Sequence, residues 1–171
     1  FLGQKLARAL LNDGHEVRLL VRNPQAVPEG LNVSVVQGDL GDEASLDRAC
    51  EGMDWVFHAA GLISYNPHKA SLMHETNVVG TANIAHAALR QGVKRFVQTS
   101  STAAIGVNED PNILLNEDSP FNARKLGLAY FDTKFDAERE LLKVVDRGLN
   151  AVIVNPGSLL GPGDTRRYEK G

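Results

Sequence analysis

The sequence predicts an α/β domain with a mainly parallel β-sheet. Short apolar segments alternate along the chain with longer segments of helical pattern, and this alternation is typical of a parallel sheet covered by helices. The helical segments end in glycine, which suits the left-handed cap of a helix. A chain of 171 residues with 43% hydrophobic content has the size of one globular domain, residues 1–171, and can bury a core.

The first half of the chain is expected to contain two strand and helix pairs. Residues 6–12 have a helical pattern that Gly14 closes, and residues 15–21 form the first expected strand. A second strand at residues 33–37 precedes a short helix at residues 45–50. Each strand is a short, mainly apolar run bounded by polar or turn-forming residues, which is the usual signature of a buried strand.

The second half continues the alternation with longer helices. Each helix is followed by a glycine, and the last strand runs into a proline, which ends regular structure. The expected strands are residues 54–60, 95–99 and 150–155, and the expected helices are residues 75–91 before Gly92 and residues 130–146 before Gly148. The segment between Ser101 and Tyr130 is rich in turn-forming residues and too long for a simple connection, so we expect it to flank a substrate.

Tyr130, Lys134 and Ser101 carry the strongest functional signal. Residues four positions apart lie on one face of a helix, so the Tyr130 phenol and the Lys134 ammonium can share a site. A neighbouring cation favours the phenolate form of a tyrosine. Such a tyrosine can exchange a proton with a substrate oxygen while a hydride moves to or from the carbon, which is general acid–base catalysis. Ser101, at the end of a strand, would hold the same oxygen with a hydrogen bond.

Composition argues against several other kinds of protein. The formal net charge is −3, and the Lys and Arg residues are scattered, so no nucleic-acid partner is expected. No apolar run approaches the ~20 residues needed to span a bilayer, and no leader opens the sequence, so the expected location is cytoplasmic. The single cysteine, Cys50, is interpreted as a small buried hydrophobe. The five histidines lack a ligand spacing, so no metal is expected.

The two ends of the sequence are unusual for such a domain. Residues 1–3 enter a helix directly, without a strand or a glycine-rich turn before them. We therefore expect a fragment that lacks the first strand of its sheet and most of a C-terminal substrate region. A parallel sheet without that strand would expose unpaired backbone groups and an apolar face, and the isolated fragment is expected to be inactive.

Several short motifs, in a fixed order, resemble one family. Gly3 resembles the last glycine of a Thr-Gly-x-x-Gly-x-x-Gly turn, and Asn77-Val-Val-Gly80-Thr81 resembles the Asn-x-x-Gly-Thr of a central helix. A glycine inside a long helix costs roughly 1 kcal/mol relative to alanine, so Gly80 indicates close packing. With Ser101, Tyr130 and Lys134, these motifs are similar to those of the extended short-chain dehydrogenases/reductases, which include nucleotide-sugar epimerases and dehydratases, dihydroflavonol reductases and 3β-hydroxysteroid dehydrogenases.

The resemblance implies a Rossmann-type doubly wound sheet and a nicotinamide cofactor. Asp39 would accept a hydrogen bond from the adenine amine, although an acid in an ordinary strand-to-helix turn would look the same. The segment after residue 154 would meet the nicotinamide carboxamide, but Asn155 replaces the family's usual Arg. The residues that the resemblance assigns to the cofactor are Gly3, Arg22, Asp39, Leu40, Ala59, Ala60, Gly61, Asn77, Thr99, Tyr130, Lys134, Pro156 and Ser158.

Arg22 favours NADP over NAD. In the family, an acidic residue at the end of the second strand would bind the ribose hydroxyls of NAD. That strand corresponds to residues 15–21 of this chain, and Arg22 follows it. A guanidinium group pairs bidentately with a phosphate. A solvated surface arginine is the alternative interpretation.

The reaction expected from the resemblance is reduction of a carbonyl or oxidation of a secondary alcohol. Thr102 and Ala103 stand where sugar dehydratases carry an Asp-Glu pair, and Ile105 and residues 62–65 suggest a less polar, steroid-like substrate. A nucleotide-sugar epimerase remains the second interpretation, because it uses the same three residues. A third interpretation is a non-catalytic NADP-binding sensor or scaffold. The presence of both Tyr130 and Lys134 makes this interpretation less favoured. The helices at 75–91 and 130–146 could form a homodimer interface, but helices that merely cover a sheet would look the same.

Overall fold

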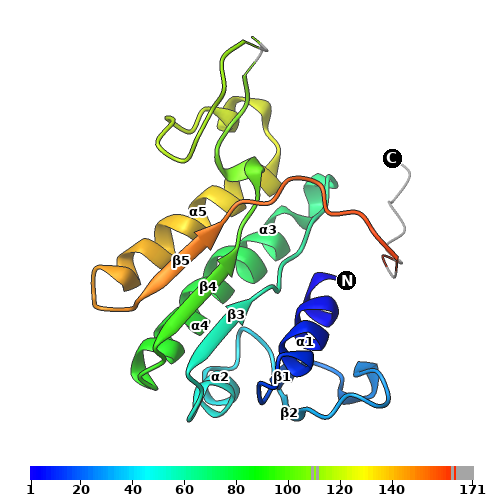
Figure 1. Cartoon of the computed structure of the whole chain (residues 1–171). Coiled ribbons are helices and arrows are strands. Elements are labelled where there is room, and N and C mark those ends of the chain that lie inside the picture. Colours follow the sequence, from blue (N-terminus) through cyan, green and yellow to red (C-terminus); the bar gives the residue numbers. More distant parts are fainter. Residues whose placement is uncertain (109, 111, 163, 165–171) are drawn as a thin grey trace.

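The structure is a computed structural model that describes residues 1–108, 110, 112–162 and 164. Five strands alternate with helices, as predicted (Figure 1). The strands are β1 (Arg18–Val21), β2 (Ser34–Gln37), β3 (Trp55–His58), β4 (Arg95–Thr99) and β5 (Ala151–Val154). The helices are α1 (Leu2–Asn12), α2 (Glu43–Cys50), α3 (Ala70–Met73), α4 (Gly80–Arg90) and α5 (Ala129–Val145). The part of the predicted domain at residues 165–171 lies outside the described residues.

The strands form two parallel sheets rather than one. β1 pairs with β2, and β3, β4 and β5 pair in that order. In the described part of the chain, β1 bonds only to β2, and β3 bonds only to β4, so one edge of each strand has no ladder partner. This arrangement confirms the predicted α/β fold with a parallel sheet that lacks one strand.

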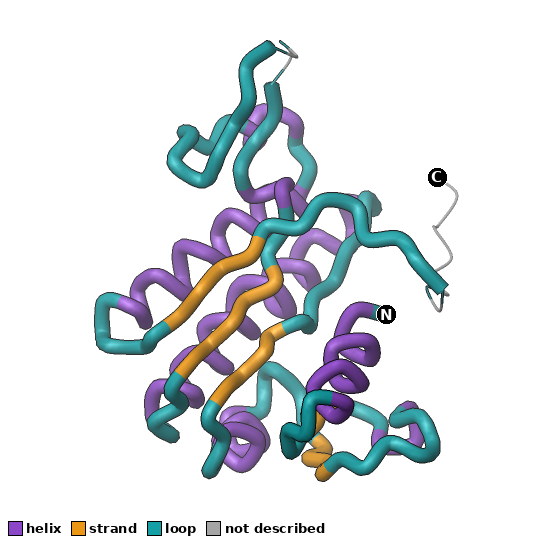
Figure 2. The backbone as a smooth tube through the Cα atoms, in the orientation of Figure 1, coloured by secondary structure: helices purple, strands orange, loops and turns teal. Residues whose placement is uncertain are grey.

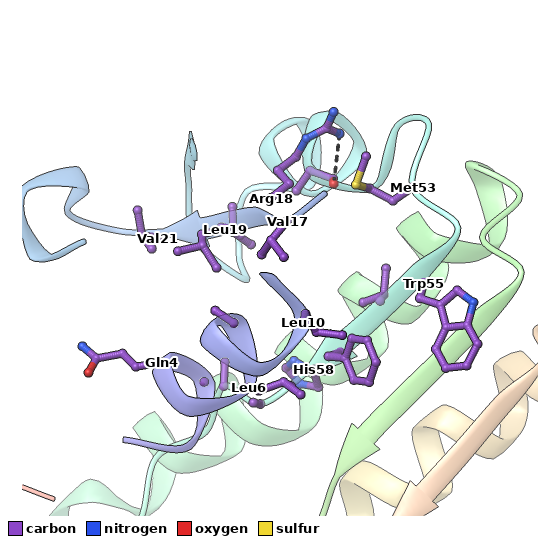
Figure 3. A pocket seen from close by; sticks show the side chains of 18 of the residues that line it. Gln4, Leu6, Leu10, Val17, Arg18, Leu19, Val21, Met53, Trp55 and His58 are labelled. Atoms are coloured by element: carbon purple, nitrogen blue, oxygen red, sulfur yellow. Dashed lines mark hydrogen bonds between the residues drawn. The ribbon is translucent and has the colours of Figure 1, made fainter. Parts of the chain in front are cut away.

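A cavity of about 1280 Å³ lies between the two sheets. Its walls include Leu6 and Leu10 of α1, Leu19 of β1 and Phe57 of β3. Figure 3 shows labelled side chains of α1, β1 and β3 around this cavity. The apolar lining, together with the two unpaired edges, marks the position of the absent strand.

One face of the β3–β4–β5 sheet is covered by helices. α3, α4 and α5 lie behind the three strands in Figure 2. The buried core is formed by residues of the sheet and of α2, α4 and α5. Phe96 of β4 is fully buried in this core against residues of α2, α4 and α5. On the same sheet, Trp55, Val152 and Val154 remain exposed, as expected for a sheet with an apolar face left open.

Cys50 lies in the core at the end of α2, as predicted for a small buried hydrophobe. Burial raises the pKa of its thiol to about 11. Arg18 supports the same helix end, because its guanidinium donates to the carbonyl oxygens of Arg48, Ala49 and Glu51 at distances of 3.1, 3.3 and 2.6 Å. The Arg18 cation therefore satisfies the last carbonyl groups of α2. Because Arg18 belongs to β1, these bonds also connect that strand to the helix.

Three helix ends follow the glycine pattern. Gly14, Gly92 and Gly148 have φ angles of 84°, 69° and 109°, in the left-handed region. After α1 the chain closes with a hydrogen bond from the His15 amide to the carbonyl of Leu10. Residues 15–17 therefore belong to the helix cap and its exit, and β1 begins only at Arg18 rather than at the predicted residue 15.

The central helix differs most from its prediction. It begins at Ala70 instead of residue 75, and His74–Val79 forms a π-helical turn between α3 and α4. A π-helical turn inserts one residue into the helical repeat and is frequently found at functional sites. The close packing predicted at Gly80 is confirmed, because a Cβ atom there would lie 2.8 Å from Leu40 Cδ1.

Candidate active site

The candidate active site is built where β3, β4 and β5 end. These strands are parallel, so their carboxyl ends meet at one edge of the sheet. Loops leave that edge together in Figure 2, and α5 begins beside them. Ligands of open α/β sheets bind outside the carboxyl ends of the strands.

Lys134 is a buried and hydrogen-bonded side chain of this site. It is only 8% exposed, and its Nζ donates to the backbone carbonyl of Thr99 at 3.1 Å. Burial lowers the pKa of Lys134, and the carboxylate of Glu138 opposes this effect. Tyr130 lies one turn earlier on α5, on the same helical face as Lys134. The bond to Thr99 thus holds the helical face predicted to carry Tyr130 and Lys134 against the end of β4.

Ser101 follows β4 and begins a short 3-10 turn, Thr102–Ala104, against which α5 packs. Its Oγ accepts a hydrogen bond from the amide of Ala103 at 3.2 Å. Because the hydroxyl acts as an acceptor in that bond, its own proton remains available to a ligand. Ser101 is half-buried.

Asn77 links the site to the loop after β3. Its Oδ1 accepts from the Leu62 amide at 2.7 Å, and its Nδ2 donates to the Leu62 carbonyl at 2.8 Å. Nδ2 also donates to the Thr133 hydroxyl at 3.1 Å, and that hydroxyl donates to the Tyr130 carbonyl at 3.0 Å. One buried amide in the π-helical turn therefore fixes the loop against the first turns of α5.

His58 is buried at the end of β3, and its Nε2 lies 3.0 Å from the Thr81 hydroxyl. The Thr81 hydroxyl donates to the carbonyl of Asn77 at 2.6 Å. His58 must therefore donate through Nε2–H, which fixes the neutral tautomer. Burial, with a smaller effect from the Lys134 charge, lowers the pKa of His58 to about 4.

This depressed pKa predicts a loss of stability at mildly acidic pH. The unfolded chain takes up the His58 proton near pH 6.5, whereas the folded chain takes it up near pH 4. Folding is therefore disfavoured progressively as the pH falls through this window, by up to roughly 3 kcal/mol. We expect the free energy of unfolding, measured by urea denaturation from pH 7 to 4, to fall more steeply in the wild type than in His58→Gln. Parallel curves would contradict the prediction.

Arg22 and Asp39 lie together at the carboxyl ends of β1 and β2. Arg22 Nε is 3.9 Å from Asp39 Oδ2, and the Arg22 side chain is 86% exposed. Asp39 Oδ1 accepts from the Gly41 amide at 3.1 Å. The cap of α2 is Asp42, whose Oδ1 accepts from the Ser45 amide at 3.3 Å, so Asp39 is not the capping residue. The two residues predicted to contact the adenosine therefore have exposed side chains, and both lie at the carboxyl ends of β1 and β2.

The remaining predicted cofactor residues lie around the cavity or follow the ends of strands. Gly3, Ala59 and Ala60 line the cavity, and Leu40 packs on Gly80. Gly61 faces Asn77 and Lys134, since a Cβ atom there would be 3.4 Å from Asn77 Oδ1 and 3.6 Å from Lys134 Nζ. The Pro156 carbonyl accepts from the Thr102 amide at 3.1 Å, and Ser158 is exposed. Their roles remain predictions.

Sequence reasoning missed the side chains that connect these residues. Thr133 and Glu138 contact the site through hydrogen bonds or charge, yet each looks like an ordinary helix residue in the sequence. Thr81 belongs to the motif Asn77-Val-Val-Gly80-Thr81, but the motif does not indicate its contact with His58. The one available signal is position. Thr133 lies between Tyr130 and Lys134, and Glu138 is one turn beyond Lys134 on the same face.

In the described part of the chain, no group of three or more His, Cys, Asp and Glu residues is arranged to hold a metal ion. None of the described helices has the length and apolar character required to cross a membrane.

Comparison with known proteins shows which family this chain resembles. The whole of residues 1–171 matches the model of the NAD dependent epimerase/dehydratase family. The chain is 37% identical to "Sterol demethylase protein B" of Methylococcus capsulatus over 96% of its own length and 50% of that protein. It is 37% identical to a "Putative dihydroflavonol 4-reductase" of Synechocystis over 97% of its length and 48% of that protein.

A solved structure agrees with these relatives. The chain superposes with a TM-score of 0.84 and 26% identity on a UDP-glucose 4-epimerase of Thermus thermophilus in complex with NAD, covering 99% of this chain and 56% of that one. The chain spans about half the length of the curated relatives it matches. These matches confirm the predicted resemblance, and the chain belongs to the NAD dependent epimerase/dehydratase family.

Proposed function

We propose that this chain forms the cofactor-binding and catalytic part of an oxidoreductase that moves a hydride between a nicotinamide and a carbonyl or secondary alcohol. The observation that supports it best is the environment of Lys134. A buried ammonium group donates to the carbonyl at the end of β4 and shares a helical face with Tyr130. Burying a charged lysine is costly unless its ammonium group is paired or hydrogen-bonded. This lysine lies one helical turn from the predicted acid/base, Tyr130.

The residues at the strand ends fit a nicotinamide cofactor. Ala59, Ala60 and Gly61 follow β3 with small side chains, so a flat ring can approach the backbone closely. Lys134 Nζ lies beside Gly61, within reach of a ribose hydroxyl placed there. The Arg22 guanidinium, which is largely exposed, offers a phosphate contact at the adenosine end.

The chain's own side chains would transfer the proton that accompanies the hydride. The bound cofactor supplies or accepts the hydride. In the reducing direction, Tyr130 donates its phenolic proton to the carbonyl oxygen, and Lys134 stabilises the resulting phenolate. Ser101 donates a hydrogen bond to the same oxygen, because its acceptor side is already engaged by Ala103. In the oxidising direction each step is reversed.

We propose NADP as the preferred cofactor, with Arg22 as the discriminating residue. Arg22→Asp removes the phosphate partner and adds a negative charge beside Asp39. A charge-assisted hydrogen bond is worth about 1.5–3 kcal/mol, so its loss should make the NADPH dissociation constant roughly 10- to 100-fold larger. The affinity for NADH should change much less. Titrating both nucleotides by fluorescence measures the difference.

Arg48→Asp is the matched control for this substitution. It reverses the same charge on the exposed surface of α2, near the end of that helix rather than at the strand ends. Equal losses in both variants would mean that Arg22 acts only through net charge. A wild type that binds NADH more tightly than NADPH would contradict the proposed preference.

A second candidate function is nucleotide-sugar epimerisation, which would oxidise and re-reduce one carbon with Tyr130, Lys134 and Ser101. The similarity to a UDP-glucose 4-epimerase structure favours it. The apolar Ile105 beside the site and the exposed Ile63 and Tyr65 favour a reductase with a less polar, steroid-like substrate. Turnover without added nucleotide would identify the epimerase, whereas stoichiometric NADPH consumption would identify the reductase. Nucleotide binding without either reaction would identify a sensor or scaffold.

A further inference from the structure

A polar pair behind the predicted catalytic residues joins β5 to α5. Asn155 follows β5 and is half-buried. Its Nδ2 donates to the backbone carbonyl of Ser101 at 3.1 Å and to the Glu138 carboxylate at 2.7 Å. Both hydrogens of the amide are thereby used. A single side chain therefore fixes the backbone of Ser101 relative to α5.

Glu138 lies one turn beyond Lys134 on the same face of α5. The hydrogen bond from Asn155 holds its carboxylate in place, and because an amide is neutral, it leaves the negative charge uncancelled. Asn155 thus gives this chain a fixed carboxylate one helical turn from a buried ammonium.

The other groups around Lys134 carry no opposing charge. His58 approaches from β3, and it is neutral near pH 7 because burial lowers its pKa to about 4. Asn77 approaches from the π-helical turn with an uncharged amide. Among the described residues, Glu138 is the group whose charge raises the pKa of Lys134 against the effect of burial.

We propose that Asn155 and Glu138 are positioning residues for the reaction. Asn155 fixes the backbone of Ser101 and the Glu138 carboxylate, and that carboxylate favours the charged form of Lys134 on the helical face that Lys134 shares with Tyr130. This inference rests on the proposed function for its catalytic part, whereas its electrostatic part concerns this chain alone. No proton is transferred to or from Glu138 in this role.

The electrostatic part is tested by NMR. The Cε chemical shift of Lys134, assigned by its disappearance in Lys134→Met, is followed against pH. Glu138→Gln keeps the acceptor for Asn155 but removes the charge, so we expect the Lys134 titration midpoint to fall. Glu140→Gln is the matched control, since Glu140 pairs with the exposed Lys143 on the same helix. An unchanged or higher midpoint in Glu138→Gln would overturn the pairing.

The positioning part is tested by kinetics with Asn155→Leu, in a protein that carries this chain together with a substrate-binding region. The substitution keeps a similar volume but removes both donors. We expect kcat to fall about tenfold with the NADPH dissociation constant within about twofold of the wild type, since ~1.4 kcal/mol corresponds to tenfold. A urea midpoint checks that the variant folds, and Asn155→Gln, which restores an amide, should recover part of kcat.

The two tests separate this inference from the proposed function. An unchanged kcat in folded Asn155→Leu overturns the positioning role. If the Lys134 midpoint moves as expected but the wild type transfers no hydride to any carbonyl substrate, the proposed function fails and the positioning role fails with it, while the charge pair stands. If the midpoint does not move in an enzyme that does transfer hydride, the inference fails and the proposed function stands.

Discussion

Tyr130→Phe is expected to lower kcat for hydride transfer by about 10²- to 10⁴-fold, which is the usual contribution of a general acid or base. The substitution removes the phenolic hydroxyl and keeps the ring. The edge contact of Tyr130 with Phe131, at 6.3 Å between ring centroids, should therefore persist. Steady-state oxidation of NADPH with a carbonyl substrate measures the loss, in a protein that carries this chain together with a substrate-binding region.

The cofactor dissociation constant provides the control for this prediction. A phenol that acts on the substrate oxygen contributes to the transition state, so NADPH affinity should change little in Tyr130→Phe. Lys134→Met should lower both kcat and cofactor affinity, because Lys134 lies beside Gly61 as well as on the Tyr130 face. A Tyr130→Phe enzyme that retains most of its kcat would exclude Tyr130 as the acid/base.

The fold could be predicted because its signals are local. The strand β4 matches its expected residues 95–99, where a run of apolar and β-branched residues ends in hydroxyl side chains. Glycines at positive φ mark the helix ends. The π-helical turn at His74–Val79 was missed, because one inserted residue changes the helical repeat too little to alter the apolar pattern. Its cause is tertiary, since Asn77 bonds to Leu62 and Thr133.

The candidate site could be predicted only in part for the same reason. The spacing of Tyr130 and Lys134 predicts a shared helical face, which depends on the helix alone. The bond between Asn155 and Glu138 joins two elements through the packing of β5 on α5, and no spacing rule covers it. Nor does a sequence pattern reveal that the side chains of Arg22 and Asp39, which follow neighbouring strands, approach to 3.9 Å.

A strand added between β1 and β3 should stabilise the chain strongly. Each of these strands bonds to one neighbour in the described structure, and the cavity between them is about 1280 Å³. Leucines of α1 line it on one side, and Leu40 and Ile84 line it on another. A peptide strand there would complete two ladders of backbone hydrogen bonds and bury apolar side chains on both faces.

We therefore expect a Val- and Ile-rich strand of about six residues, joined to Phe1 by a short linker, to raise the free energy of unfolding by several kcal/mol, or roughly 1 M or more in the urea midpoint. Phe1 itself lines the cavity, so the linker can be short. An extension of equal length made of Gly and Ser is the control, because it offers the same backbone without apolar side chains. Amide hydrogen exchange should show new protection in β1 and β3 with the apolar strand only. Equal midpoints for the two extensions would mean that the cavity does not take a strand, since the burial of apolar side chains is the main force that would hold one there.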